Sequence, residues 1–220
     1  ILIMLSRFTN TAKNLITKFN KPISTISING FNEDIVERSD YPINKCQEIL
    51  SDQVVSIIGY GPQGRGQSLN LRDNNINVCL GLRKGPSWDK ALEEGWTEGK
   101  DLFEMEEACY RGNVIQYLLS DVGQIQQWDK VKPLLNEGDT LYFSHGFGIT
   151  YKDKTNIIPP DNVDVVLVAP KGAGSTVRNH FLNGSGINAS YAIHQDYTGD
   201  AKDKTLALAF AIGCGHAFET

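Results

Sequence analysis

Three glycines early in the chain have the spacing of a phosphate-binding turn. Gly59, Gly61 and Gly64 form the pattern GxGxxG at the end of the apolar run VVSIIGY. In such a turn the first glycine permits a tight bend, the second lets backbone N–H groups approach a pyrophosphate, and the third allows close helix–strand packing. Short glycine patterns also arise by chance in turns without a ligand, but here a strand pattern precedes and a helix pattern follows. We therefore expect a dinucleotide to bind at this turn.

The next predicted strand ends in cations, where a site for NAD commonly carries an acid. The sequence at its end reads LRKGPS, and no acid occurs between Asp73 and Asp89. An acid would repel a 2′-phosphate, whereas Arg83 can bind one through charge-assisted hydrogen bonds, with Lys84 beside it. Ser87 can donate as well, and we expect it at the N-cap of the following helix. The pattern favours NADP over NAD, and the alternative is that both cations are ordinary solvated residues.

Three other segments follow predicted strands and should reach the same crevice, because ligands of open α/β sheets bind outside the carboxyl ends of the strands. They are LLSD, which ends at Ser120 and Asp121, FSHGFG with His145, and APKGAG with Lys171. His145 could transfer a proton or orient a substrate oxygen, or it could be a hydrogen-bonded residue that fixes the loop. Lys171 could neutralise a carboxylate or a phosphate, or it could be a surface cation.

The elements that carry these residues alternate along the chain. Strand patterns cover residues 54–60, 76–82, 113–120, 139–146, 162–170, 189–196 and 216–220. Helix patterns lie within residues 40–53, 62–74, 87–95, 102–112, 122–138, 174–186 and 199–215. Such alternation predicts βαβ units, and so a Rossmann-type, doubly wound α/β fold with a mostly parallel sheet and helices on both faces.

Residues 1–30 differ in composition from the rest of the chain. They contain four cations and no acid, and apolar residues recur among them at helical spacing. This composition is typical of organellar transit peptides, and a mobile tail that lacks acids is the alternative. We expect a mitochondrial location, with plastid or cytoplasm as alternatives. A lead-in segment should follow at 31–53 and an NADP-binding domain at 54–220.

The composition of the whole chain excludes several classes of protein. The 220 residues carry a formal net charge of −5, which gives no sign of the basic stripe that binds nucleic acids. No apolar run approaches the roughly 20 residues that cross a bilayer. The four cysteines are far apart without a CxxC pair, which argues against a zinc site or disulfide framework and for a reducing compartment. We expect neither a nucleic-acid nor a membrane partner.

Longer motifs resemble those of one known family. The turn GYGPQGRGQ, with LNLRD shortly behind it, is far more specific than GxGxxG, and LYFSHGFGI and VDVVLVAPKGAGSTVR follow in the same order. Together they resemble the ketol-acid reductoisomerases, also called acetohydroxy-acid isomeroreductases, and most closely the fungal mitochondrial type. The resemblance runs from about Phe31 to Thr220, and it agrees with a transit peptide at the start.

The resemblance implies a two-step reaction of valine and isoleucine biosynthesis. A Mg²⁺-dependent alkyl migration in 2-acetolactate or 2-aceto-2-hydroxybutyrate precedes hydride transfer from NADPH, and the products are 2,3-dihydroxy-3-methyl acids. In this family a mostly helical domain supplies the carboxylates that hold two Mg²⁺ ions, and we expect a homo-oligomer. We expect that domain to be absent here, so no metal ligand is assigned. The chain alone should bind NADPH without performing the isomerisation.

The resemblance also implies roles for individual residues. Around the pyrophosphate it places the glycine turn, with Tyr60, Gly61, Pro62 and Gln63. At the 2′-phosphate it places Arg83 and Ser87, and along the adenosine or ribose Asp121 with its neighbours Ser120, Val122 and Gly123. Gly174 matches a glycine at the nicotinamide, His145 an active-site histidine, and Lys171 the lysine of the APK turn.

One residue of the turn departs from the family pattern. Pro62 stands where Ala or Ser is often found, and it lacks an N–H, so one possible phosphate donor is lost. Two other interpretations stay open: a different NADP-dependent reductase of small hydroxy or imino acids, and a nucleotide-sensing module without chemistry. The segments SHGF and APKGAG argue against the sensing module, because they add specific residues at the edge of the crevice.

Overall fold

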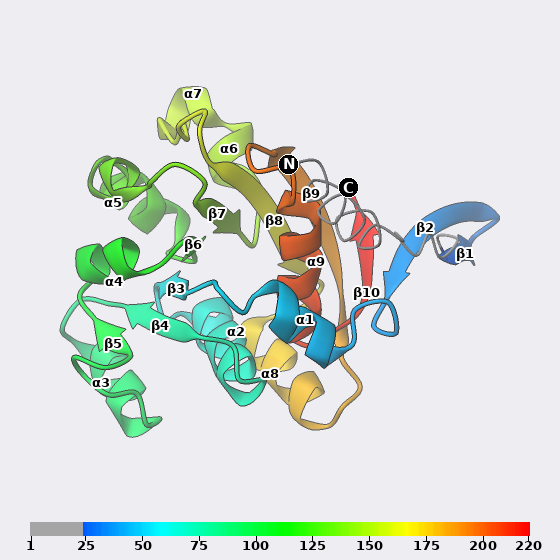
Figure 1. Cartoon of the computed structure of the whole chain (residues 1–220), viewed down its shortest axis with the longest axis horizontal. Helices are drawn as coiled ribbons and strands as arrows, with labels where there is room; N and C mark the ends of the chain where they lie inside the picture. The colour runs from blue at the N-terminus through cyan, green and yellow to red at the C-terminus, as the bar shows by residue number, and fades with distance from the viewer. Residues whose placement is uncertain (1–23) are drawn as a thin grey trace, which may run out of the picture.

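The computed structural model describes residues 24–220 of the chain. Most of the predicted transit peptide over 1–30 lies outside the described residues, and its last residues belong to a β-hairpin. From this hairpin onward, the described part of the chain forms one ten-stranded sheet with helices packed on it (Figure 1).

The middle of the sheet consists of six parallel strands. They are β3 (Val55–Ile58), β4 (Val78–Gly81), β5 (Leu102–Phe103), β6 (Val114–Tyr117), β7 (Thr140–Phe143) and β8 (Asp164–Pro170). Their order in the sheet is β5-β4-β3-β6-β7-β8, so the chain runs outward from β3 to β5 and then returns to the other side of β3. This reversal is the switch point at which open α/β sheets bind ligands. The predicted doubly wound fold is confirmed.

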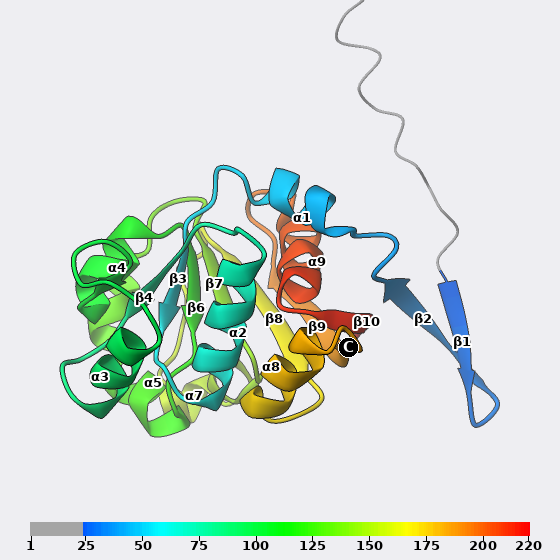
Figure 2. The ribbon, with the colours of Figure 1, turned by 90° about the horizontal axis from the view of Figure 1, so that it is seen from below.

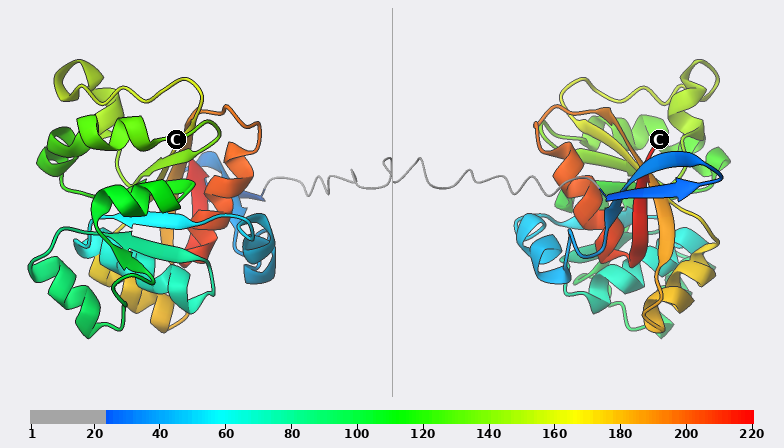
Figure 3. Two further views of the ribbon diagram at one scale, coloured as in Figure 1. Left: turned by 60° about the vertical axis from the view of Figure 1, so that its left-hand side comes forward. Right: turned by 90° about the vertical axis from the view of Figure 1, so that its right-hand side faces the viewer.

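Beyond β8 the sheet continues in strands of mixed direction. β9 (Ile187–Gln195) pairs antiparallel with β8, and β10 (Cys214–Glu219) pairs in parallel with β9. The hairpin of β1 (Ser24–Ile28) and β2 (Phe31–Glu37) then joins β10 through antiparallel pairing of β2. Figure 2 shows this hairpin projecting from the body of the molecule, and Figure 3 shows it beside β10. The predicted lead-in segment therefore contains a strand that the sequence patterns did not indicate.

Helices cover both faces of the sheet (Figure 2). One apolar cluster receives residues from α1 (Ile43–Ile49), α2 (Pro62–Asp73), α3 (Pro86–Glu93) and α9 (Ala201–Ala211), and α8 (Gly174–Leu182) packs on α2. The cluster on the opposite face receives residues from α4 (Met105–Arg111) and α5 (Asp121–Val131). Two short helices, α6 (Phe147–Thr150) and α7 (Lys152–Thr155), follow β7.

Both faces of strand β3 are buried, which explains the apolar residues on either side of Ser56 in its sequence. Val55 and Ile57 belong to the first cluster and Ile58 to the second, because side chains alternate across a strand. A strand that is buried on both faces needs apolar side chains at successive positions. The glycine turn that follows β3 is thus held by the centre of the core.

Several predicted boundaries are wrong for physical reasons. The helix expected from residue 102 begins as strand β5, because Leu102 and Phe103 are buried at the edge of β4. The helix expected to reach residue 138 ends at Val131 and continues as the 3₁₀ turn Lys132–Leu134, because Pro133 cannot donate a helical hydrogen bond. The helices α6 and α7 were not predicted.

Candidate functional site

A cleft of about 370 Å³ opens where β3, β4 and β6 end. It includes most of the cofactor residues predicted from the glycine turn, the cationic tip and the LLSD segment: Gly59, Tyr60, Gly61, Arg83, Lys84, Ser87, Ser120 and Gly123. Gln126 and Gln127 of α5 also line it, and no sequence pattern indicated them. The cleft lies at the switch point of the sheet, where a nucleotide is expected.

The structure explains each of the three glycines of the turn by a different feature of its surroundings. Gly59 has a φ of +108°, and an added Cβ would lie 2.8 Å from the carbonyl oxygen of Leu118. A Cβ on Gly64 would lie 2.1 Å from the carbonyl oxygen of Gly59. The main chain of α2 therefore packs directly against the main chain at the end of β3. At Gly61, the N-cap of α2, a Cβ would meet no other described atom within 4 Å. The space beside Gly61 is open to the cleft.

Pro62 is the first helical residue of α2. Its missing N–H costs the helix nothing, because the first N–H groups of a helix have no partner within it. The N–H groups of Gln63 and Gly64 remain in the first turn. A Cβ on Gly174 would lie 1.6 Å from the carbonyl oxygen of Pro62, so α8 begins in direct main-chain contact with α2. This contact is a packing reason for the glycine at 174.

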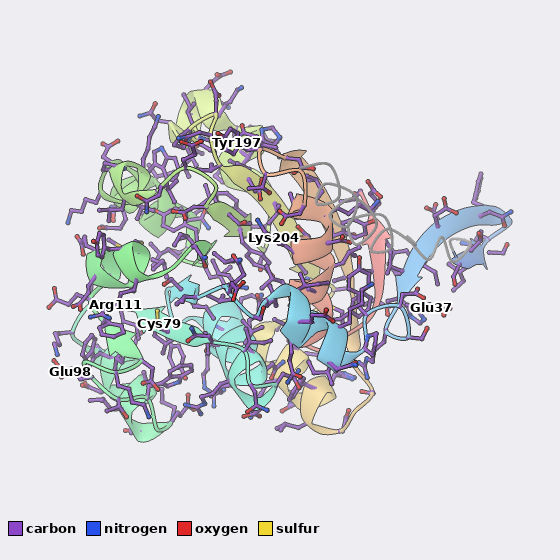
Figure 4. The ribbon with its side chains drawn as sticks, viewed as in Figure 1. Glu37, Cys79, Glu98, Arg111, Tyr197 and Lys204 are labelled. Atoms are coloured by element: carbon purple, nitrogen blue, oxygen red, sulfur yellow. The ribbon has the colours of Figure 1, made fainter. Side chains whose placement is uncertain are left out.

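The two cations at the end of β4 differ in their surroundings. Arg83 is exposed, and its side chain has no hydrogen-bond or ion-pair partner among residues 24–220. Lys84 places its ammonium 2.5 Å from a carboxylate oxygen of Glu98 and 3.6 Å from the centre of the Trp88 ring. Figure 4 shows Glu98 on the loop between α3 and β5. Arg83 is therefore the cation at this tip whose charge is uncompensated.

The prediction that Ser87 caps α3 is wrong. Gly85 is the N-cap, Pro86 is the first helical residue, and Ser87 lies one residue further inside. Gly85 has a φ of +139°, which favours glycine, and the fixed φ of proline suits the first helical position. Ser87 nevertheless lines the cleft, in the first turn of α3, where main-chain N–H groups have no partner within the helix.

The end of β6 meets the end of β7 through a pair of titratable side chains. Ser120 caps α5, where its Oγ accepts a hydrogen bond of 3.2 Å from the N–H of Gly123. Asp121 follows, and its Oδ1 lies 3.2 Å from Nε2 of His145. Val122 is exposed to solvent. The structure thus brings together two predicted site residues to which the sequence assigned unrelated roles.

Two glutamines of α2 fix the loops after β7 and β8. Gln63 donates from Nε2 to the carbonyl oxygen of Gly172 at 2.9 Å. Gln67 donates from Nε2 to Ser144 at 2.8 Å and accepts from the hydroxyl of Tyr142 at 2.9 Å. The spacing of four puts both glutamines on one face of the helix, and Gln67 also donates to Oε1 of Gln63 at 3.0 Å. This spacing is the signal by which the sequence could have indicated the network.

Lys171 follows β8 and is exposed. Its main-chain N–H donates to the carbonyl oxygen of Asn188 at 2.8 Å, whereas its ammonium has no ion-pair partner in the described part of the chain. The main chain of the loop is therefore held on both sides, by Asn188 and by Gln63, while the charged end of Lys171 is free to meet a ligand.

Tyr60 lines the cleft, and the partners of its hydroxyl, Glu94 and Trp96, do not. The hydroxyl donates to Oε2 of Glu94 at 2.7 Å, and burial together with this hydrogen bond raises the pKa of Tyr60. Burial alone would raise the pKa of Glu94, but hydrogen bonds from Arg65 and Tyr60 outweigh it and lower that pKa. The sequence patterns did not single out Glu94.

The chain matches one family model over most of this fold. The model is described as "Acetohydroxy acid isomeroreductase, NADPH-binding domain" and matches residues 49–217. The chain belongs to the ketol-acid reductoisomerase family. The resemblance inferred from the motifs is confirmed, and the cleft lies within the NADPH-binding domain of a ketol-acid reductoisomerase.

Two curated relatives are named ketol-acid reductoisomerase, and one of the two names also states a cofactor. "Ketol-acid reductoisomerase (NAD(+))" of Desulfosudis oleivorans is 51% identical over 197 residues, which are 89% of this chain and 56% of that protein. "Ketol-acid reductoisomerase, mitochondrial" of Saccharomyces cerevisiae is 49% identical over 210 residues, 92% of this chain and 53% of that protein. The chain spans about half the length of the curated relatives it matches.

A solved ketol-acid reductoisomerase has the same fold. The NADH-preferring enzyme of an uncultured archean superposes with a TM-score of 0.77 and is 35% identical, and the match covers 85% of this chain and 56% of that one. Within residues 24–220, no three His, Cys, Asp or Glu residues are placed to hold a metal ion. No helix of the described part is long and apolar enough to span a bilayer.

Proposed function

We propose that this chain is the cofactor-binding part of an NADPH-dependent ketol-acid reductoisomerase. The enzyme would convert 2-acetolactate or 2-aceto-2-hydroxybutyrate into 2,3-dihydroxy-3-methyl acids, on the route to valine and isoleucine. The observation that carries the proposal is the cleft at the switch point, with the glycine turn on one side and the unpartnered Arg83 on the other. This arrangement offers separate sites for a pyrophosphate and for a 2′-phosphate.

The pyrophosphate would lie against the first turn of α2. The N–H groups of Gln63 and Gly64 are free for it, and the open space beside Gly61 lets a phosphate approach the main chain. The N-terminus of α2 adds a partial positive charge. Pro62 removes one donor from this turn while leaving the helix intact.

The 2′-phosphate would bind at the tip of β4. Arg83 is the uncompensated cation there, and Ser87 adds a hydroxyl from the first turn of α3. Because two relatives are named for NAD(+) or NADH, the family does not by itself decide the cofactor. The proposal of NADPH rests on Arg83 and on the lack of an acid in the tip sequence LRKGPS, where an NAD site commonly carries one. Lys84 would contribute less, because Glu98 offsets its charge.

The remaining predicted residues would complete the cofactor site. The adenosine or ribose would pass along the N-terminus of α5, beside Ser120, Asp121, Val122 and Gly123. The nicotinamide would lie toward Gly174, at the contact of α8 with α2. The hydride donor would then face the loops that carry His145 and Lys171, where the ketone formed by the alkyl migration would be reduced.

His145 and Lys171 are the chain's candidates for substrate chemistry. Asp121 holds the imidazole of His145 from one side, so that the other ring nitrogen can exchange a proton with a substrate oxygen. The free ammonium of Lys171 would neutralise the substrate carboxylate. NADPH, when bound, supplies the hydride, and these side chains orient the ketone and manage the proton.

Magnesium is part of the proposed reaction, but the described residues do not form a site for it. We therefore derive no step through the metal. The matched residues make up 56% and 53% of these relatives, and we assign the magnesium ligands to a part of the enzyme that the described residues do not include. A mitochondrial location is proposed from the composition of residues 1–30 and from the name of the yeast relative. A homo-oligomeric enzyme is proposed from the family resemblance alone.

The proposed function is tested by titrating the purified chain with NADPH and NADH. The chain should bind NADPH more tightly, and Arg83→Asp should weaken NADPH binding about tenfold or more, since hydrogen bonds between charged groups are among the strong ones. NADH binding should change little. A chain that binds neither cofactor would contradict the proposal, and equal losses for both would remove the 2′-phosphate role from Arg83.

A further inference from the structure

The carboxylate of Glu94 joins the two helices whose first turns flank the cleft. Glu94 follows the last residue of α3, and its side chain is only 15% exposed. The hydroxyl of Tyr60 donates to Oε2 at 2.7 Å, and Nε of Arg65 donates to both carboxylate oxygens at 2.8 and 2.9 Å. Tyr60 belongs to the glycine turn and Arg65 to α2. One side chain at the end of α3 therefore binds both the turn and the helix behind it.

Further contacts across the same boundary surround this carboxylate. The indole N–H of Trp96, a residue only 2% exposed, donates to the Tyr60 hydroxyl at 3.0 Å. Arg72 of α2 donates to the main-chain oxygen of Glu94 at 3.0 Å, and its guanidinium lies 4.4 Å from the centre of the Trp96 ring. Charge-assisted hydrogen bonds are roughly twice as strong as neutral ones, so this network firmly connects α2 with the end of α3.

The two helices differ in how they are held elsewhere. The first turns of α2 pack main chain to main chain against the end of β3 and the start of α8, and Asn70 donates to the carbonyl oxygen of Ile212 at 2.7 Å. Within α3, only Trp88 and Ala91 are buried. If the Glu94 carboxylate were lost, α2 would keep its position and α3 would be the element that moves.

We infer that Glu94 is a positioning residue that sets the cofactor preference, by holding α3 at a fixed distance from the glycine turn. This inference rests on the proposed binding of NADPH in the cleft. Pyrophosphate and 2′-phosphate belong to one molecule, so their sites must keep their separation within about 0.5 Å. The start of α3 carries Ser87 and adjoins Arg83, so a shift of α3 displaces the 2′-phosphate site. NADH does not use that site.

The test compares Glu94→Gln with Glu93→Gln in the purified chain, by titration with NADPH and NADH and by thermal unfolding. Glu93 is a matched control, because it is adjacent, 69% exposed and paired only with Lys90 among the described residues. Glu94→Gln should raise the Kd for NADPH about tenfold, as expected for lost charge-assisted bonds. The Kd for NADH should change less than about twofold, because a substitution that touches no binding group usually has an effect of this size. Glu93→Gln should change neither.

The outcomes separate this inference from the proposed function. If Glu94→Gln weakens both cofactors equally, or neither, Glu94 does not set the preference, although the proposed function stands. If the unmodified chain binds neither cofactor, the proposed function itself fails. Should Glu94→Gln not fold, Tyr60→Phe takes its place, because it removes the hydroxyl while keeping the ring in the core. It should shift the preference in the same direction, and an equal effect on both cofactors would overturn the inference.

Discussion

Oδ1 of Asp121 lies 3.2 Å from Nε2 of His145, across the adjacent ends of β6 and β7. Both side chains are about half exposed, so the pair faces the solvent side of the strand ends, where a substrate would enter. A neutral imidazole that donates from Nε2 to a carboxylate keeps Nδ1 as its acceptor. The pair therefore selects which ring nitrogen is offered to a substrate.

Replacing Asp121 by Asn should impair the proposed chemistry without removing the histidine. The assay uses the full-length enzyme with 2-acetolactate, NADPH and Mg²⁺. We expect Asp121→Asn to lower kcat about tenfold, which is part of the ~10²–10⁴-fold rate increase that a positioned proton-transfer group contributes. Asp121→Glu should restore part of the loss. Asp129→Asn changes an exposed carboxylate on the same helix and is the control. An unchanged kcat with a raised KM would instead assign Asp121 to binding.

Glu98 should act against NADPH, because its carboxylate offsets the charge of Lys84 beside the proposed 2′-phosphate site. We expect Glu98→Gln to strengthen NADPH binding by about two- to fivefold at low salt, in keeping with the ~0.2–1 kcal/mol of exposed ion pairs. The gain should shrink at high salt, and NADH binding should not change. Glu48→Gln, at an exposed position of α1, is the control. Weaker NADPH binding would mean that Glu98 holds Lys84 in place for the phosphate.

Two glycines near the cleft should respond to alanine in opposite ways. At Gly174 an added Cβ would lie 1.6 Å from the carbonyl oxygen of Pro62, and main-chain atoms cannot rotate away. We expect Gly174→Ala to lower the free energy of unfolding by at least about 1–3 kcal/mol, the usual cost of overpacking. Urea denaturation of the variant measures this loss directly.

At Gly61 the same substitution should spare stability and affect binding. No other described atom lies within 4 Å of the added Cβ, and the φ of −70° suits alanine. We expect Gly61→Ala to keep the free energy of unfolding within about 0.5–1 kcal/mol, the scale of losing a favourable N-cap. It should weaken NADPH and NADH alike, because the new methyl group occupies the approach to the pyrophosphate. Unchanged binding of both cofactors would place the phosphates elsewhere.

The stability contributed by Glu94 should depend on pH. Hydrogen bonds from Arg65 and Tyr60 hold the pKa of Glu94 below its usual 4.5 in the folded chain. The unfolded chain therefore takes up this proton at a higher pH than the folded chain does. The contribution is complete above about pH 4.5 and is lost as the pH falls through the folded pKa. The difference in free energy of unfolding between the unmodified chain and Glu94→Gln, about 1–2 kcal/mol at pH 7, should diminish below pH 4.5. A difference that is constant with pH would contradict this account.

The sequence was informative where local patterns decide the structure. The apolar runs of β3 and β6, buried on both faces, and the glycine turn between β3 and α2 were visible as patterns. The hairpin β1–β2 carried a signal as well, since Asn29 and Gly30 form a two-residue turn, both with positive φ. That signal went unused because residues 1–30 were interpreted from their composition alone.

The candidate site was less accessible to sequence reasoning. Roles that follow from a residue's own chemistry, such as the charge of Arg83, could be proposed from the sequence. Partners that meet only through the sheet topology could not, which is why the pairs of Asp121 with His145 and of Lys84 with Glu98 were missed. Ser87 was misplaced because Gly85 and Pro86 together begin α3 earlier than a serine cap would.

The contact between Gly174 and Pro62 affects how much of the contact energy of a bound molecule would appear as affinity. The glycine turn and the start of α8 touch through main-chain atoms, so no change of rotamer can alter their separation. A molecule that contacts both the glycine turn and the start of α8 would bind to main-chain segments whose relative position is already fixed. Binding would therefore not incur the entropic cost of ordering these segments, and more of the contact energy would contribute to affinity.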